Sequence, residues 1–376
     1  TLADLDAAIA AAAPLATAAH DGHRPSLILY TSGTSGRPKG ALLSERNLAE
    51  TAINIAILAR IGNGSRVLND SPMFHVIGLV TNLRAYWMQG GAVLMSDGFD
   101  PARTIARIAD PALAVTHYFC VPAMAAMIRR HPDFTPAKLA GLTAIFTGGA
   151  PNPPADIVEW LDDGIPIVNG YGMSETGTLI GMPVEIDGIR RRLTSAGVAT
   201  GRVELRIADD DARPLPSRRA GEIQVRGPNV GARYWRRPQE SAAAFLPGGW
   251  FATGDIGVMD DDGFVSIIDR KKDMFISGGE NVYPAEIEAV VAQFAAIADC
   301  AVIGTPDPTW GEVGHLFVVV ATGADFDHDA LSGHLAARLA RYKLPKCITV
   351  VDVLPRNGAG KVQKLALKHA SLTGTT

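Results

Sequence analysis

The chain has 376 residues, a formal net charge of −4, and a composition that is 47% hydrophobic and 20% charged. This length exceeds what one ordinary hydrophobic core organises and predicts two domains, while the composition excludes a disordered or fibrous protein. Both signs of charge are spread along the chain, which excludes a strongly basic nucleic-acid surface. No apolar run approaches the roughly 18 residues of a membrane-spanning helix.

The opening segment TLADLDAAIAAAAPLATAAH is rich in alanine, contains Asp4 and Asp6, and has no basic start. It is typical of a helix or linker and not of a secretory signal peptide. Cys120, Cys300 and Cys347 have no metal-ligand spacing, so we expect reduced, mostly buried thiols in a cytoplasmic protein.

The first strand is expected in SLILY at 26–30, directly before a loop rich in glycine and hydroxyl groups, YTSGTSGRPKG at 30–40. The next segment, SERNLAETAINIAILARIG, has apolar residues at helical spacing and Ser44 as a plausible cap. The loop is therefore expected between a strand and a helix.

Apolar runs of strand length then alternate with segments of helical spacing. The strands are expected in GGAVLMS, AVTHYFCV, LTAIFTGG and IPIVNGYG, and the helices in PARTIARIAD, PAMAAMIRRH and ADIVEWLDDG. This alternation predicts an α/β fold whose mostly parallel sheet is covered on both faces.

The pattern changes after about Gly197, where short strands and turns predict a β-rich subdomain. Beyond the charged run DRKKD, a second alternating set predicts a small, mobile α+β domain. We therefore expect a large N-terminal domain at 1–268, a hinge at 269–272 and a C-terminal lid domain at 273–376.

The loop at 30–40 has the residue types of a polyphosphate-binding loop. Glycines allow the backbone to approach an anion, hydroxyls donate hydrogen bonds, a lysine adds positive charge, and the expected helix offers free N–H groups at its start. These residues are Thr31, Ser32, Gly33, Thr34, Ser35, Gly36 and Lys39. A solvated glycine–serine turn is the alternative. The loop is not a Walker loop, because Pro38 precedes the lysine.

YTSGTSGRPKG closely resembles the phosphate-loop signature of the adenylate-forming superfamily, which includes acyl-CoA synthetases, aryl-CoA ligases, luciferases and peptide-synthetase adenylation domains. The resemblance continues in order to the C-terminus and covers nearly the whole chain. The further motifs are PMFHVIG (72–78), GGAPNPP (148–154), NGYGMSETG (169–177), TGD (253–255), DRKKDMFISGGENVYPAEIE (269–288) and LPRNGAGKVQK (354–364).

The resemblance implies a nucleotide site built from several of these motifs. Tyr171 is expected to stack on adenine, Ser174 to bond phosphate, and Asp255 with Arg270 to bind the ribose. Glu175 is expected to hold Mg²⁺, a cation that prefers carboxylate and phosphate oxygens. The remaining expected ATP-binding residues are Gly149, Ala150, Pro151, Asn169, Gly170 and Gly172.

The resemblance also implies catalytic roles for Lys361, which would neutralise charge developing at the α-phosphate, for Glu175, and for His75 beside the acid. Lys272 occupies the hinge position. Asn357 departs from the small hydroxyl residue that the family carries in this loop. The expected acyl pocket comprises His75, Val76, Gly78, Gly148, Met173 and Gly177, and the expected thiol tunnel comprises Ser277, Gly278, Gly279 and Glu280.

Taken without the family, each of these residues has an ordinary reading. Glu175 is then a surface or capping carboxylate, Asp255 a turn residue and Lys361 a solvated lysine. His75, between Phe74 and Val76, is equally consistent with a hydrogen-bonded core histidine and with a site residue.

The activity implied is formation of an acyl-adenylate from a carboxylic acid and Mg·ATP, followed by thioester formation with coenzyme A. The apolar, small residues of the acyl motifs favour a fatty acid, with an aryl acid as the alternative. A carrier protein is an alternative thiol acceptor, and an inactive nucleotide-binding or scaffold fragment is the alternative from another class.

Family members carry a long segment before the phosphate loop, whereas a short alanine-rich lead precedes Tyr30 here. The resemblance therefore implies a truncated start. We expect exposed apolar surface where such a segment would pack, and a possible homodimer. No nucleic-acid partner is expected.

Overall fold

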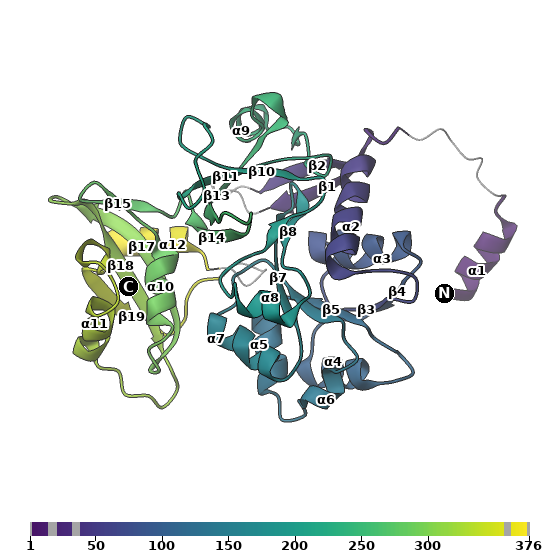
Figure 1. The fold of residues 1–376 in the computed structure, drawn as a ribbon, viewed down its shortest axis with the longest axis horizontal. Helices are drawn as coiled ribbons and strands as arrows, with labels where there is room; N and C mark the ends of the chain where they lie inside the picture. The colour runs from purple at the N-terminus through teal and green to yellow at the C-terminus, as the bar shows by residue number, and fades with distance from the viewer. Residues whose placement is uncertain (1, 14–20, 32–37, 357–361, 374–376) are drawn as a thin grey trace.

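The computed structural model describes residues 2–13, 21–31, 38–356 and 362–373. Helix α1 (Leu2–Ala11) stands apart from the rest of the chain in Figure 1. Within the described part of the chain, no helix has both the length and the apolar character needed to cross a bilayer.

The largest sheet has seven strands in the order β4-β3-β5-β6-β7-β8-β9. Pairing is parallel from β4 to β7 and antiparallel from β7 to β9. The bounds are β3 Arg66–Asn69, β4 Ala92–Met95, β5 His117–Cys120, β6 Ala144–Thr147, β7 Ile167–Met173, β8 Gly177–Gly181 and β9 Val198–Ala199. The predicted mostly parallel sheet is confirmed.

Helices cover both faces of this sheet, as Figure 1 shows for α2 and α3 on one side and α4 to α7 on the other. Their bounds are α2 Glu45–Ala59, α3 Ala85–Met88, α4 Pro101–Ala109, α5 Pro122–Arg130, α6 Pro136–Leu139, α7 Pro154–Asp162 and α8 Ile186–Arg190, with a π-helix, η1, at Ile77–Arg84. α4 to α7 each begin with proline in the first turn, where the missing N–H costs nothing. The largest apolar core lies between these helices and the sheet.

The phosphate-loop segment differs from the expectation of a strand–loop–helix unit. Residues Lys39–Ser44 form a strand, β2, antiparallel to β1 (Pro25–Thr31), and α2 begins only after it. Ser44 caps α2 as expected, since its hydroxyl accepts a hydrogen bond from the Asn47 N–H at 3.2 Å. The loop therefore closes a hairpin, and the prediction that a helix N-terminus follows it directly is wrong. β2 also pairs with β12 (Arg233–Tyr234).

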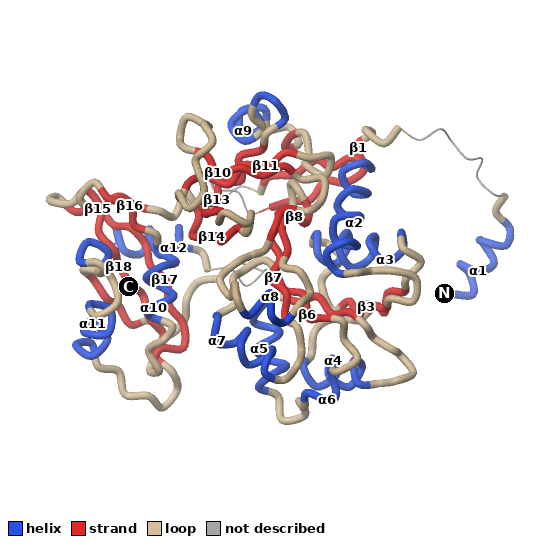
Figure 2. Tube along the Cα trace, viewed as in Figure 1, coloured by secondary structure: helices blue, strands red, loops and turns tan. Residues whose placement is uncertain are grey.

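The predicted β-rich section forms a four-stranded antiparallel sheet in the order β10-β11-β13-β14. Its strands are β10 Glu204–Ala208, β11 Gly221–Arg226, β13 Phe251–Met259 and β14 Val265–Arg270, with α9 at Pro238–Ala244 and a 3₁₀ turn, η2, at Pro247–Gly249. Figure 2 shows this strand-rich part above the parallel sheet.

The C-terminal part has a five-stranded sheet with its own apolar core. Its elements are β15 Phe275–Ser277, β16 Glu280–Val282, α10 Pro284–Val291, β17 Ile297–Asp307, β18 Gly311–Val320, α11 His328–Ala336, a 3₁₀ turn η3 at Arg341–Lys343, β19 Cys347–Val350 and α12 Lys364–Thr373. The domain boundaries at 268 and 273 stay a prediction.

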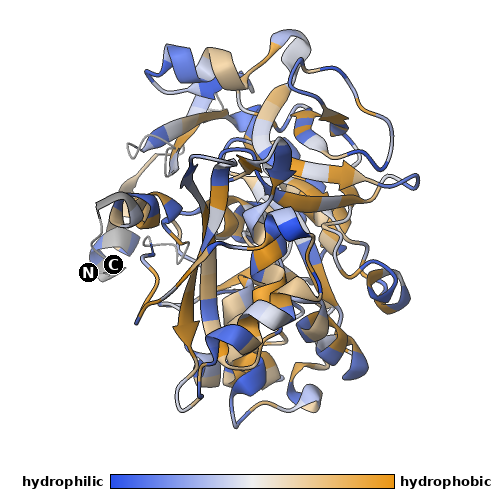
Figure 3. Ribbon diagram, turned by 90° about the vertical axis from the view of Figure 1, so that its left-hand side faces the viewer, coloured by the Kyte–Doolittle hydropathy of each residue, from blue (hydrophilic) through white to orange (hydrophobic). Residues whose placement is uncertain are grey.

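Figure 3 shows apolar residues concentrated along the sheet strands, with hydrophilic residues more frequent on peripheral helices and turns. The three cysteines are free, but only Cys120 is buried; Cys300 is half-buried and Cys347 is exposed. The expectation of mostly buried thiols is therefore wrong for Cys347, which lies in the edge strand β19 of the C-terminal sheet.

Candidate functional site

Two of the predicted motifs meet where the carboxyl end of β6 lies beside the middle of β7. The amide of Asn152 donates to the hydroxyl of Thr147 and to the side-chain oxygen of Asn169, each at 2.6 Å. Gly148 is buried so close to the Gly170 carbonyl that a Cβ there would lie 3.4 Å from it. The predicted residues Gly149, Ala150 and Pro151 follow as an exposed turn. This places the motifs at 148–154 and 169–177 side by side.

The predicted ribose-binding residues also come together. The Tyr171 hydroxyl donates to Asp255 at 2.6 Å across 84 residues of sequence. Register pairing between β13 and β14 sets Asp255 opposite Arg270, whose Nε lies 3.5 Å from the Asp255 carboxylate. Burial and the Asp255 charge raise the pKa of Tyr171 well above its ordinary value, so its hydroxyl stays a donor. Asp255 is thus a buried carboxylate held on two sides.

Glu175 lies in the turn between β7 and β8 and is only 5% exposed. Its carboxylate accepts a 2.8 Å hydrogen bond from the Tyr234 hydroxyl, and its carbonyl accepts one from the Gly231 N–H at 2.8 Å. Burial and the Glu175 charge raise the pKa of Tyr234. Sequence reasoning missed Tyr234, because the segment GARYWRRP carries no motif with chemistry of its own.

The base of the phosphate-loop hairpin lies beside this carboxylate. Tyr234 pairs in register with Ala41 of β2, and the Lys39 ammonium lies 5.2 Å from the centre of the Tyr234 ring. Thr31 pairs in register with Lys39. Ser32, Gly33, Thr34, Ser35 and Gly36 lie outside the described residues. The strand that leaves the loop therefore lies beside Tyr234, whose hydroxyl binds Glu175.

Helix α2 fixes the turn that holds Glu175. The carbonyl of Thr176 accepts hydrogen bonds from Thr51 of α2, at 3.4 Å, and from the Asn229 amide, at 2.7 Å. Asn47, the third residue of α2, donates to the carbonyls of Pro228 and Val230 at 2.8 Å. None of these side chains belongs to a predicted motif residue, and no local sequence signal marks them.

Gly177 has φ +62°, and a Cβ there would lie 2.2 Å from the Thr51 side chain. We expect Gly177→Ala to lower the free energy of unfolding by roughly 2–5 kcal/mol, from overpacking and left-handed backbone strain together. Gly188→Ala in α8, where the nearest atom lies 3.8 Å away, is the control and should not destabilise. Equal denaturation midpoints for the two variants would contradict this account.

The His75 loop follows β3 and leads into η1. His75 is half-buried, and its Nδ1 accepts a 3.3 Å hydrogen bond from the Ile77 N–H. Val76 is buried in an apolar cluster with Leu43 and Leu48. Met173 packs against the core of the antiparallel sheet. η1 contacts β8, which brings the loop towards the strand after Glu175.

The C-terminal motif forms the β15–β16 hairpin, with Ser277 opposite Glu280. Gly278 and Gly279 have φ +62° and +88°, and the Gly278 N–H donates to the Trp310 carbonyl at 2.9 Å. Figure 1 shows this hairpin well away from β7 and β8. The exposed Lys272 lies between β14 and β15, and Lys361 lies outside the described residues. The structure thus does not bring 277–280 to Glu175 and Asp255.

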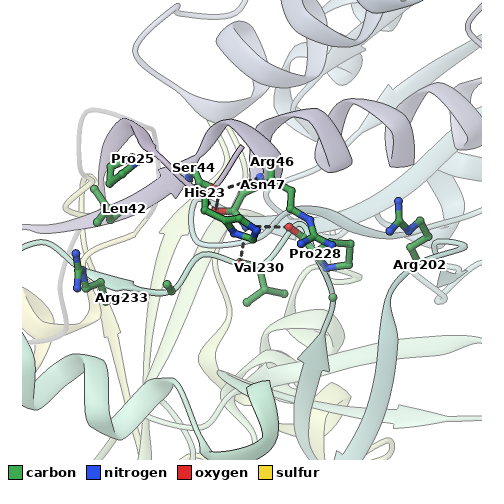
Figure 4. A pocket seen from close by; sticks show the side chains of 12 residues that line it. His23, Pro25, Leu42, Ser44, Arg46, Asn47, Arg202, Pro228, Val230 and Arg233 are labelled. Carbon is green, nitrogen blue, oxygen red and sulfur yellow. Dashed lines mark hydrogen bonds between the residues drawn. The ribbon is translucent and has the colours of Figure 1, made fainter. Parts of the chain in front are cut away.

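Two surface grooves lie outside the predicted residues. One, of about 540 Å³, is shown in Figure 4, with Arg233 near one end, Asn47 in the middle and Arg202 near the other. The other, of about 490 Å³, is apolar, lies between β1, α2, η1 and α3, and is bordered by the exposed Trp87 and Met88. None of the predicted site residues lines either groove.

Comparison with known protein families identifies the family whose ordered motifs this chain carries. Residues 3–235 match the family model described as AMP-binding enzyme, and residues 286–361 match that of the AMP-binding enzyme C-terminal domain. The chain belongs to the AMP-binding enzyme family. The resemblance to the adenylate-forming superfamily is thereby confirmed, and so is the α/β fold class.

The chain is also similar in sequence and structure to individual AMP-binding enzymes. The chain is 40% identical over 340 residues to a feruloyl-CoA synthase of Amycolatopsis sp, covering 90% of this chain and 68% of that one. It is 41% identical over 340 residues to an indoleacetate–CoA ligase of Aromatoleum aromaticum, covering 90% and 66%. ATP-bound MatB from Rhodopseudomonas palustris superposes with a TM-score of 0.90 at 33% identity, covering 97% of this chain and 72% of that one.

Proposed function

We propose that the chain activates a hydrophobic carboxylic acid with ATP and transfers the acyl group to coenzyme A. The proposal is carried by two contacts of one motif: Tyr171 donates to Asp255, and Glu175, four residues later, accepts from Tyr234 on the strand that pairs with β2. Similarity to CoA ligases for feruloyl and indoleacetate groups, and to an ATP-bound structure, supports it.

The Glu175 site fits Mg²⁺. Its ligand is a buried carboxylate, and the described residues contain no cluster of three or more His, Cys, Asp or Glu side chains that would hold a metal alone. Mg²⁺ typically takes one or two carboxylates and completes its shell with phosphate oxygens and water. When bound, it would neutralise phosphate charge. Tyr234 would orient the Glu175 carboxylate, because its hydroxyl donates to one oxygen.

In the first half-reaction, an oxygen of the acid carboxylate attacks the α-phosphorus, and the bond to the bridging oxygen of the β-phosphate breaks to release pyrophosphate. Asp255 would accept hydrogen bonds from the ribose hydroxyls, with Tyr171 and Arg270 fixing its orientation. His75 would contact the acid, and Lys361 would stabilise the charge at the α-phosphate. Positioning and charge neutralisation supply the rate.

In the second half-reaction, a thiol sulfur attacks the acyl carbon, AMP leaves, and the thiol proton passes to solvent. The residues proposed for the thiol tunnel, 277–280, lie apart from Glu175 in the structure. A rotation of residues 273–376 about Lys272 would bring them in and remove Lys361. The division at 269–272 is part of this proposal.

The acid class divides into two candidates. An aryl or arylalkyl acid is favoured by similarity to the feruloyl and indoleacetate enzymes. A fatty acid, the preference drawn from the sequence, is favoured by the apolar and small residue types in the expected acyl motifs, such as Met173 and Gly148. A panel of ferulate, indoleacetate and saturated acids, with thioesters measured by mass spectrometry, separates the two. Replacing coenzyme A with a phosphopantetheinylated carrier protein tests the alternative acceptor.

For Lys361→Ala we expect pyrophosphate release to fall by about 100-fold or more, because the charge at the α-phosphate loses its partner. Capture of a supplied acyl-adenylate by coenzyme A should change less than about twofold, since Lys361 is removed in that step. Lys368→Ala, on α12, is the control. Equal losses in the two half-reactions would contradict the assignment.

A further inference from the structure

A pair of buried amides underlies the His75 loop. Asn69, the last residue of β3, and Asn82, on η1, are each 1% exposed. The Asn82 amide nitrogen donates to the Asn69 side-chain oxygen at 2.9 Å. The two side chains therefore connect the strand before the loop with the helix after it.

Asn69 also binds the loop itself. Its amide nitrogen lies 3.4 Å from the Gly78 carbonyl and 3.4 Å from the Met73 sulfur, and its side-chain oxygen accepts from the Ser71 N–H at 3.2 Å. One side chain thus touches the start, the middle and the end of the 71–78 loop.

The loop is folded tightly back on itself and continues into a π-helix. A Cβ at Gly78 would lie 2.4 Å from the Pro72 carbonyl oxygen, so this closure requires glycine. π-Helices are rare, and they often occur at functional sites. His75 lies inside this closed loop, where its backbone N–H donates to the Pro72 carbonyl at 3.1 Å and its carbonyl accepts from the Leu79 N–H at 3.0 Å.

Burying this amide pair lowers the stability of the fold, so packing alone does not explain why it is there. The Asn82 side-chain oxygen is buried and has no hydrogen-bond partner among the described residues. A buried acceptor without a partner lowers stability, whereas apolar side chains of similar size would not carry that cost. What the amides add is direction, because each hydrogen bond fixes one point of the loop.

We infer that Asn69 and Asn82 are positioning residues, which hold the 71–78 loop and through it orient His75 towards the acid substrate. The role of the acid rests on the proposed function, whereas the fixing of the loop rests on the hydrogen bonds alone. Neither side chain reaches the surface, so both act through the loop and not by touching the acid.

Asn82→Leu tests the inference by kinetics. We expect the KM for the acid to rise by about tenfold or more, with the KM for ATP changed less than about twofold. In a His75→Ala background, the same substitution should have little further effect on the KM for the acid. Gln224→Leu is the matched control, because Gln224 is another 1% exposed amide, bonded to Arg206 in the antiparallel sheet. It should lower stability without a selective effect on the acid.

Hydrogen exchange followed by mass spectrometry tests the same inference without any activity. Asn82→Leu should accelerate exchange of the amides in 71–84 by about tenfold or more, whereas Gln224→Leu should leave this segment unchanged. Unchanged exchange at 71–84 in the Asn82 variant would overturn the inference. So would a rise in both KM values that merely follows the loss of stability. If the wild type activates no acid, the proposed function fails, and exchange alone decides the fixing of the loop.

Discussion

Glu175→Gln should lower the rate of acid-dependent pyrophosphate release by about 100-fold or more, with the melting temperature nearly unchanged. Glutamine preserves the volume and can still accept the hydrogen bond from Tyr234, which the Glu175 carboxylate accepts at 2.8 Å. The substitution removes the negative charge, which is the property that a hard cation requires. Stopped assays of pyrophosphate at saturating Mg·ATP measure the effect.

Tyr234→Phe is the matched variant for that experiment. It removes the hydrogen bond to Glu175 but leaves its carboxylate charged, so we expect a smaller loss, of roughly 5- to 20-fold. Raising the Mg²⁺ concentration should partly rescue Tyr234→Phe but not Glu175→Gln. If Glu175→Gln retained full activity, the proposed metal-binding role would be wrong.

Asp255→Asn should weaken ATP binding by roughly 10- to 150-fold, the range for losing hydrogen bonds of about 1.5–3 kcal/mol to a charged group. Asp255 is 6% exposed, accepts from Tyr171 at 2.6 Å and faces Arg270. Asparagine keeps the shape, but it provides one acceptor oxygen instead of two charged ones. Titration calorimetry with ATP measures the affinity directly.

The specificity of this effect is tested with deoxynucleotides. If Asp255 binds the ribose, the wild type should prefer ATP over its 2′,3′-dideoxy analogue, and Asp255→Asn should lose that preference. Asp269→Asn is the neighbouring control. Asp269 is half-buried and accepts from the Ala285 N–H at 2.8 Å, outside the Tyr171–Asp255 contact. An unaltered preference in Asp255→Asn would rule out ribose binding by this residue.

The sequence predicted the parts of the molecule whose signals are local. The parallel sheet follows from the alternation of apolar strands and helices, and the cap of α2 follows from Ser44. Glu175, Tyr171 and Asp255 stand in short ordered motifs, so the sequence alone predicts them as site residues. The contact between Tyr171 and Asp255, which are 84 residues apart in the sequence, needed the structure.

The parts that sequence reasoning missed depend on distant pairing. Lys39–Ser44 is short and apolar, and it becomes a strand because β1 and β12 both pair with it. The same pairing places Tyr234 so that its hydroxyl donates a hydrogen bond to Glu175. Asn69 and Asn82 belong to none of the predicted motifs. Their hydrogen bond to each other forms only when the loop between them is folded.

The exchange of labelled pyrophosphate into ATP tests most directly whether the phosphate-loop hairpin, Glu175 and Asp255 form one adenylating site. We predict exchange that requires an acid from the aryl or fatty panel and that disappears in both Glu175→Gln and Asp255→Asn. Bound ATP with no acid-dependent exchange for any acid, or exchange that persists in both variants, would contradict the proposed site.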